Sequence, residues 1–165
     1  MADRWVDDVA IRVVYDRNAL PLNLHGLKGP ELFGGVYMSR DLLVAWRAGA
    51  PDRIRWIVRN EYDPDWARER AVRTTEVPFR TTDAEAQIVA VRQGLGMTTL
   101  PCFVGDSDPL VVRAPGAALH MHGTLWLLTQ GETRKTKRVR LFTEFVSRRL
   151  AAYAPLLAGL CSSSD

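Results

Sequence analysis

Residues 80–83 of this 165-residue sequence, Arg80-Thr81-Thr82-Asp83, combine side chains that could bind a small ligand. They stand where an extended segment gives way to a helix. Exposed backbone amides at a helix start attract anions, so the amides and the two hydroxyl groups together could hold a carboxylate or a similar anion. Capping of the helix by Thr82 explains the same spacing without a ligand, and position alone favours that simpler interpretation.

A second constellation is His120-Met121-His122, which puts two imidazoles on the same side of a strand, an arrangement that can chelate a metal. His25 is the only other histidine, and no acidic residue or cysteine stands at ligand spacing. We therefore expect neither a metal site nor a cofactor. The sequence also lacks a Gly-rich phosphate loop, a Gly-x-Ser-x-Gly elbow and a His-Glu-x-x-His helix, so no motif supports an enzyme.

The composition, with 47% hydrophobic residues, is ordinary for one globular domain or two small lobes. No apolar run is long enough to cross a bilayer and the first residues lack a signal-peptide core, so we expect a cytoplasmic protein. Cys102 and Cys161 stand too far apart for a disulfide framework and are expected to be free thiols. The net charge of +3 concentrates in residues 134–140. This cluster could attract phosphate, but an apolar period continues through it and favours a solvated helix start.

The pattern predicts strands and helices in alternation. Short apolar, β-branched runs predict strands over 8–14, 34–38, 53–58, 72–79, 97–104, 109–113 and 123–128. Helices are expected over 40–47, with Ser39 as N-cap, from Thr82 to about Gly94 or Gly96, and over 136–153, and a short helix or turn is expected over 63–70. Prolines and glycines between 18 and 30 predict a turning segment. The alternation predicts an α/β fold with mainly parallel strands, in which ligands sit at the carboxyl ends of the strands.

Two helices carry detailed expectations. Thr82 and Glu85 have the spacing of a capping box, so Thr82 is expected to cap its helix. That helix should turn one apolar face inward, namely Ala84, Ile88, Val91 and Leu95. The last helix should bury Phe142, Phe145, Val146, Leu150 and Tyr153. On its outer side Glu144 and Arg148 are expected to form an i,i+4 pair.

Several stretches, taken in order, resemble the effector-binding domain of LysR-type transcriptional regulators. The segment from Thr82-Asp83-Ala84-Glu85-Ala86 to Gly94-Leu95-Gly96-Met97 and Leu100-Pro101 is similar to the hallmark of that family. Residues 8–12 resemble the strand that enters the hinge, and 125–128 through 139–142 resemble the closing strand and helix. Residues 35–39 with Leu42 match more loosely, because Arg40 and Asp41 replace the usual proline and aromatic residue.

The resemblance implies two Rossmann-like lobes similar to type 2 periplasmic binding proteins, with the first lobe incomplete. The substrate-binding domain would span 1–160, with residues 1–17 and 106–160 in the first lobe, 18–105 in the second, and 161–165 as a disordered tail. In the family the effector lies in the cleft between the lobes. The positions that match cleft residues are Thr81 and Thr82, at the helix start, and Arg12, near the hinge.

The function implied is non-enzymatic sensing of a small, anionic effector, such as a carboxylate, to regulate transcription as a homodimer or in a pair with related regulators. In the family a helix-turn-helix and the first strands of the first lobe precede the matched region. We expect no direct DNA binding from this chain, and an exposed sheet edge that invites pairing with another chain. Two alternatives stay open: a stand-alone module that pairs with full-length regulators, and a non-functional remnant.

Overall fold

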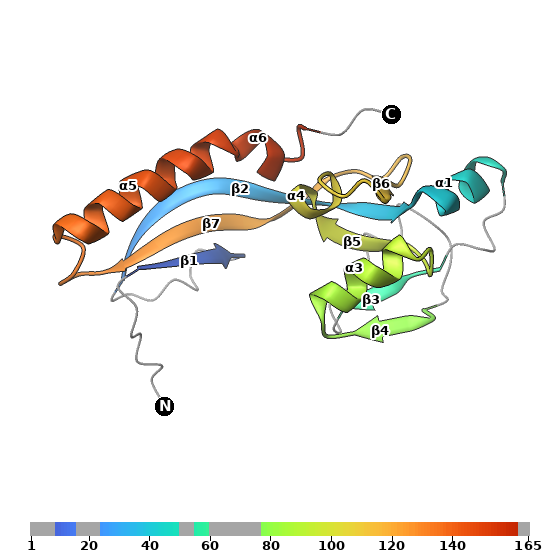
Figure 1. Ribbon diagram of the computed structural model, residues 1–165, viewed down its shortest axis with the longest axis horizontal. Helices are drawn as coiled ribbons and strands as arrows, with labels where there is room; N and C mark the ends of the chain where they lie inside the picture. Colours follow the sequence, from blue (N-terminus) through green and yellow to red (C-terminus); the bar gives the residue numbers. More distant parts are fainter. Residues whose placement is uncertain (1–8, 16–23, 50–54, 60–76, 162–165) are drawn as a thin grey trace.

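The computed structural model describes residues 9–15, 24–49, 55–59 and 77–161. The short helix or turn predicted over 63–70, most of the strand predicted over 72–79 and the tail beyond Cys161 lie outside these residues. The elements, labelled in Figure 1, are β1 (Val9–Val14), β2 (Leu24–Ser39), α1 (Arg40–Arg47), β3 (Ile57–Arg59), β4 (Phe79–Thr81), α3 (Ala84–Arg92), β5 (Thr98–Pro101), α4 (Cys102–Gly105), β6 (Val111–Arg113), β7 (His120–Gln130), α5 (Lys137–Ala152) and α6 (Ala154–Leu157).

Helices and strands pack together as the predicted α/β class requires, but the pairing of the strands differs from the prediction. The main sheet has the order β1-β7-β2-β5, with β6 also on β2, and every pair in it is antiparallel. Among the described residues, parallel pairing occurs only between β3 and β4 and at the Trp56–Met97 bridge. The expectation of mainly parallel pairing was therefore wrong for the described strands, because β7 lies between β1 and β2 and runs antiparallel to both.

The strand β2 is 16 residues long and connects the two ends of the molecule (Figure 1). Its first part pairs with β7, and residues from Gly34 onward pair with β5 and β6. The predicted turning segment was thus wrong over 24–30, which is strand. Gly26 is there because a Cβ would stand 2.8 Å from Cε3 of Trp126, and the ladder shifts register between Lys28 and Glu31. Gly26 therefore marks the place where Trp126 packs closely on the backbone, and the register shift marks a β-bulge. Neither feature is a turn.

The core of the β3–β5 half consists of two adjoining clusters of buried side chains. Trp56 and Met97 are fully buried in the first, and Tyr37 and Val91 in the second. Ser39 caps α1 as predicted, since its Oγ accepts a hydrogen bond from the Leu42 amide at 3.2 Å. These clusters hold β3 and β4 under α3.

A buried polar junction ties β2, α4 and β6 together. The Tyr37 hydroxyl donates to Asp106 Oδ1 at 2.8 Å. Arg113 donates to the same carboxylate with Nε at 2.8 Å and with Nη2 at 2.5 Å, and Nη2 also donates to the Gly159 carbonyl at 2.7 Å. Burial, followed by the hydrogen bond to Asp106, raises the pKa of Tyr37 and keeps its phenol neutral.

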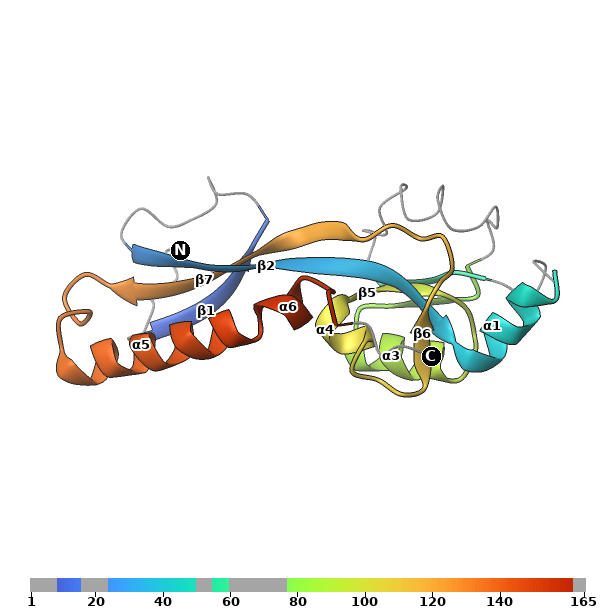
Figure 2. The ribbon, with the colours of Figure 1, turned by 90° about the horizontal axis from the view of Figure 1, so that it is seen from above.

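Helix α5 covers one face of the β1-β7-β2 part of the sheet (Figure 2). Val146 is buried as predicted, and Leu150 is partly buried. The prediction was wrong for Phe142, Phe145 and Tyr153, which are 49%, 57% and 47% exposed. The apolar stripe of α5 is wider than the three strands beneath it, so one flank of the helix stays outside.

Polar side chains on α5 lie in solvent. The ion pair that the structure shows on its outer side joins Glu144 to Arg140 at 4.0 Å, rather than to Arg148. The sequence predicted that the basic cluster at the start of the last helix lies in solvent. Within residues 134–138 both arginines and both lysines are exposed, as predicted. Both cysteines are free thiols, with Cys102 buried and Cys161 exposed. Among the described helices, none is long and apolar enough to span a membrane.

Candidate functional site

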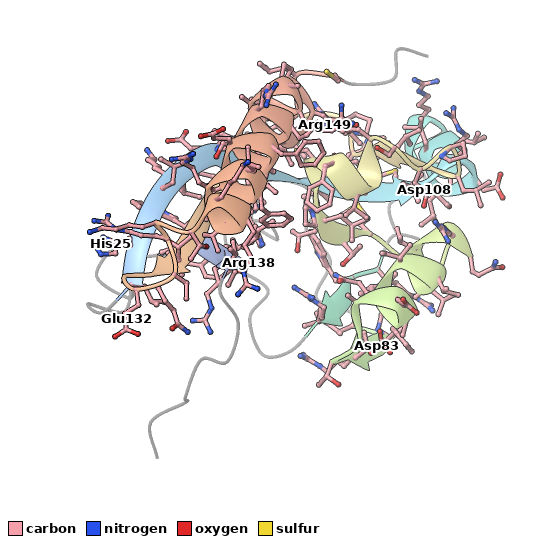
Figure 3. The ribbon with its side chains drawn as sticks, turned by 60° about the vertical axis from the view of Figure 1, so that its left-hand side comes forward. His25, Asp83, Asp108, Glu132, Arg138 and Arg149 are labelled. Carbon is pink, nitrogen blue, oxygen red and sulfur yellow. The ribbon has the colours of Figure 1, made fainter. Side chains whose placement is uncertain are left out.

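The start of α3 is capped by Asp83 and not by Thr82, so the predicted capping box was wrong. Asp83 Oδ1 accepts hydrogen bonds from the amides of Glu85, at 2.7 Å, and Ala86, at 3.4 Å. One carboxylate thus satisfies two of the free amides of the first turn, and its charge opposes the helix dipole favourably. Thr82 is exposed, one residue outside the cap. Figure 3 shows Asp83 at the start of this helix.

This cap changes how an anion could be held there. The amides that an anion would use are already bonded to a carboxylate of the protein, whose negative charge disfavours a second one. The Thr81 hydroxyl accepts a hydrogen bond from the Asp83 amide at 3.0 Å and donates a long one, 3.5 Å, to the Asp83 carbonyl, so a ligand acceptor would have to replace that long bond. An anionic ligand must therefore take its positive partner from another element.

The buried side of α3 fixes the position of this helix start. Gln87 is 3% exposed and its amide nitrogen donates to Thr98 Oγ1 at 2.5 Å, while Thr98 Oγ1 donates to the Ile57 carbonyl at 2.9 Å. Of the predicted inward face, Val91 is buried and Ile88 partly buried. Ala84 and Leu95 are exposed, because the face that meets β3 and β5 is rotated toward Gln87.

The strands β3 and β4 end side by side. They are parallel, and Arg59 stands in register with Thr81 at their carboxyl ends. Both side chains are partly buried. Arg59 therefore supplies a guanidinium group at the edge where ligands of parallel strands gather, beside a threonine hydroxyl.

Two histidines of β7 lie at the same place. Burial lowers the pKa of His122, and the charge of Arg59 lowers it further, so these two groups from different sheets lie within electrostatic reach of each other. Burial lowers the pKa of His120 to about 4. The His120 and His122 ring centroids are 6.2 Å apart, and the Tyr15 ring stands edge-on to His122 at 5.4 Å. Both imidazoles are neutral at pH 7.

The predicted site residues are thus partly brought together. Thr81 and Thr82 adjoin Arg59 at the end of β4, and Arg12 lies opposite Trp126 on β1, the strand that leads to Tyr15. Sequence reasoning missed Arg59 and Tyr15. Arg59 directly follows the strand predicted over 53–58, so the rule on the carboxyl ends of strands could have found it.

The sequence pattern indicates only one possible role for His122, that of a metal ligand. Among the residues that the structure describes, no group of three or more His, Cys, Asp or Glu side chains could hold a metal ion. The site therefore offers hydrogen-bond donors and one cation to a small molecule.

Comparisons with known proteins place this geometry in a family. The model described as LysR substrate binding domain matches residues 52–151. Among solved structures, the regulatory domain of CrgA, a LysR-type transcriptional regulator from Neisseria meningitidis, is similar, with 14% identity over 87% of this chain and 75% of that one and a TM-score of 0.63. The effector domain of AmpR of Pseudomonas aeruginosa gives 18% identity over 89% and 74% of the two chains and a TM-score of 0.62.

The full-length virulence activator AphB of Vibrio cholerae, a member of the LTTR protein family, is similar at 18% identity and a TM-score of 0.60. The match covers 87% of this chain and 52% of that one. A comparison with curated protein sequences found no significant match. The structural neighbours confirm the two-lobed fold similar to periplasmic binding proteins. Because the family match covers more than half of its residues, this chain belongs to the LysR substrate-binding domain family of non-enzymatic, regulatory effector-binding domains.

Proposed function

We propose that this chain senses a small effector of the carboxylate class at the place where β3 and β4 end against β7. The observation that supports the proposal best is Arg59, a partly buried cation beside Thr81 whose charge reaches His122. A regulatory role in effector sensing follows from the family. The chemistry of the ligand and the residues that hold it are our inference.

Arg59 is the recognition group in this proposal. A guanidinium group donates two parallel hydrogen bonds to one carboxylate, and such charge-assisted bonds are about twice as strong as neutral ones. Thr81 and Thr82 add hydroxyl donors from the same edge, and the neutral imidazole of His122 adds an N–H from β7. Arg12 is a further candidate on β1. The Glu85 and Ala86 amides of α3 have no role in binding, since the Asp83 carboxylate occupies them.

Binding at this place would couple to the conformation of the domain. Arg59 and Thr81 belong to the small parallel sheet, whereas His122 and Tyr15 belong to the main sheet. A ligand that touches both groups binds more tightly when they are close together. That difference in affinity is what shifts the population toward a closed state.

Thermal unfolding in the presence of mono- and dicarboxylates, aromatic and aliphatic, tests this function. We expect at least one compound to raise the Tm of the wild-type protein in proportion to the logarithm of its concentration. Arg59→Gln should weaken that compound roughly tenfold or more, by loss of the charged bonds. Arg80→Gln is the matched control, because Arg80 carries the same charge on an exposed side chain next to Thr81.

Two results would contradict the proposal. One is that no compound of a broad carboxylate panel moves the midpoint of unfolding. The other is that Arg80→Gln and Arg59→Gln weaken binding equally, which would mean that general surface charge attracts the ligand and that no specific contact exists at the end of β3.

A further inference from the structure

Arg59 is a partly buried cation that has no counter-ion in the described part of the chain. No carboxylate of the described residues pairs with it. Three other arginines, Arg92, Arg113 and Arg140, each meet a carboxylate of the protein. A charge that is partly removed from water is unfavourable unless a partner compensates it. The end of β3 therefore lacks a negative charge that a ligand can supply.

His122 is a second polar group that is open to a ligand at this place. Its side chain is partly buried, and the rings of Tyr15 and His120 lie beside it, with centroids 5.4 Å and 6.2 Å away. Within the described residues, its ring nitrogens make no hydrogen bond. At least one nitrogen of an imidazole carries a proton, and both do when the ring is charged. His122 can therefore donate to an acceptor of the ligand.

The charge on His122 depends on what lies next to it. Burial lowers the pKa of His122 and the charge of Arg59 lowers it further, so the ring is neutral at pH 7. A carboxylate beside the ring opposes both causes, because it accepts a hydrogen bond from the imidazolium and balances the charge of Arg59. Binding of such a group raises the pKa of His122 and favours its protonation.

The other titratable and charged groups around His122 leave this role to the ligand. Tyr15 and Arg12 come from the β1 segment, and His120 from β7 itself. Glu31 of β2, like Arg12, stands in register with an even-numbered residue of β7, so both share the face of His122. Burial keeps His120 neutral, with a pKa of about 4. The Glu31 carboxylate is engaged by a lysine three residues earlier, at 3.7 Å.

On the basis of the effector site proposed above, we infer that it takes a dicarboxylate: one carboxylate meets Arg59, the other meets His122, and one proton enters from solvent with the ligand. The proton goes to the unprotonated ring nitrogen of His122, and no covalent bond changes. The bound state then holds two positive and two negative charges. A monocarboxylate on Arg59 leaves His122 neutral and takes up no proton.

A dicarboxylate at this place links the two halves of the molecule. Arg59 belongs to the small parallel sheet and His122 to the main sheet. Figure 1 shows the arrowhead of β1 directed toward the half that contains β3 and β4, and the arrowhead of β4 directed back toward the half that contains β1. The second carboxylate is the group that reaches β7, so His122 selects for a ligand with two charges.

Proton uptake gives the affinity a definite dependence on pH. His122 is neutral in the free protein and charged in the complex, so a lower pH favours the complex. For one proton the affinity rises by at most about tenfold per pH unit. Between pH 8 and pH 6.5 we therefore expect the dicarboxylate to bind more tightly by up to about thirtyfold. The affinity of a monocarboxylate should stay constant within about twofold, because no group that it contacts changes its charge.

Isothermal titration calorimetry on the full chain tests this inference. The probes are malonate, succinate, glutarate and adipate, each compared with its own monoamide, which has the same size and one charge fewer. Titrations at pH 6.5 and 8, in buffers of different ionisation enthalpy, count the protons taken up. At pH 6.5 one dicarboxylate should bind at least tenfold more tightly than its monoamide, with more than half a proton taken up per site.

Variants of two histidines separate the site from general effects. His122→Gln should lower the affinity for the dicarboxylate to that for the monoamide and abolish the proton uptake. His25→Gln is the matched control, because His25 is an exposed histidine near the start of β2, and it should behave like the wild type. NMR of the histidine rings decides the matter should His122→Gln fail to fold. In the wild type the His122 ring should titrate below pH 6.5 without ligand and at a higher pH with the dicarboxylate.

The outcomes distinguish this inference from the carboxylate function on which it rests. Equal affinities for a dicarboxylate and its monoamide, or tight binding of a dicarboxylate without proton uptake, would overturn the inference and leave the function standing. The same holds if only monocarboxylates bind. If no carboxylate of either kind binds at either pH, both the inference and the proposed function are overturned.

Discussion

Replacement of Asp106 by alanine should be among the costliest single changes in this protein. The carboxylate is 2% exposed and accepts hydrogen bonds from Tyr37 and twice from Arg113, whose own side chain is 28% exposed. Removing one partner of a buried ion pair costs about 3 to 5 kcal/mol, because the remaining charge is left without compensation. The partial exposure of Arg113 lets water reach the guanidinium group, so we expect the lower end, about 3 kcal/mol.

Urea denaturation of four proteins measures this value: the wild type, Asp106→Ala, Arg113→Met and the double variant. The double variant should lose about 1 to 2 kcal/mol less than the sum of the two single variants, because it leaves neither charge unpaired. Tyr37→Phe is a useful fifth protein, with an expected cost of about 1 kcal/mol for one hydrogen bond. A cost of Asp106→Ala below about 1 kcal/mol, or strict additivity in the cycle, would refute this account of the junction.

Further predictions concern the cap, a histidine and a glycine. Asp83→Ala should lower the free energy of unfolding by about 1 kcal/mol and Thr82→Ala by under about 0.5 kcal/mol, measured in urea; the reverse order would restore Thr82 as the cap. The pKa of His120 is about 4 when folded and 6.5 otherwise, so the unfolded state binds more protons between these values. Its contribution to stability is complete above pH 6.5 and falls as pH drops toward 4, by roughly 1 to 2 kcal/mol after solvent screening, and His120→Gln should flatten that slope. Gly96→Ala should cost more than about 2 kcal/mol in urea, because its Cβ would overlap sterically with the backbone carbonyl of Arg55. Gly49→Ala, with open space and only a positive φ, should cost less.

The same pH series separates two explanations of acid sensitivity. If His120 is responsible, the stabilities of the wild type and of His120→Gln should change with different slopes between pH 4 and 6.5 and run parallel above pH 6.5. Equal slopes for both proteins across that window would assign the acid sensitivity to other groups.

The sequence predicted those parts of the fold that depend on neighbouring residues. Ser39 caps α1 and Gly94, with a φ of +73°, follows α3, as local rules require. At the start of α3 both Thr82 and Asp83 could cap, and local rules do not choose between them. The choice depends on where β4 ends, at Thr81, whose hydroxyl already bonds the Asp83 amide.

Features that depend on distant segments could not be predicted in this way. The periodicity of α5 marks Phe142 and Phe145 as apolar but contains no information about the width of the sheet below. Similarly, Gly26 looks like a turn residue until Trp126, one hundred residues later, is seen to cover it. The candidate site is of the same kind, because Arg59 and His122 are brought together only by the packing of β3 against the main sheet.

The long strand β2 constrains how the two halves can move. Its 16 residues extend about 50 Å, from the β7 ladder to the β5 and β6 ladders, as one covalent and hydrogen-bonded rod. A long paired strand of this kind resists bending at a hinge but can twist about its own axis. It deforms most easily where its ladder is interrupted, between Lys28 and Glu31 and between Leu32 and Phe33. Movement of one end should therefore reach the other as a change in twist, small in displacement but large in its effect on the angle of the distant strands.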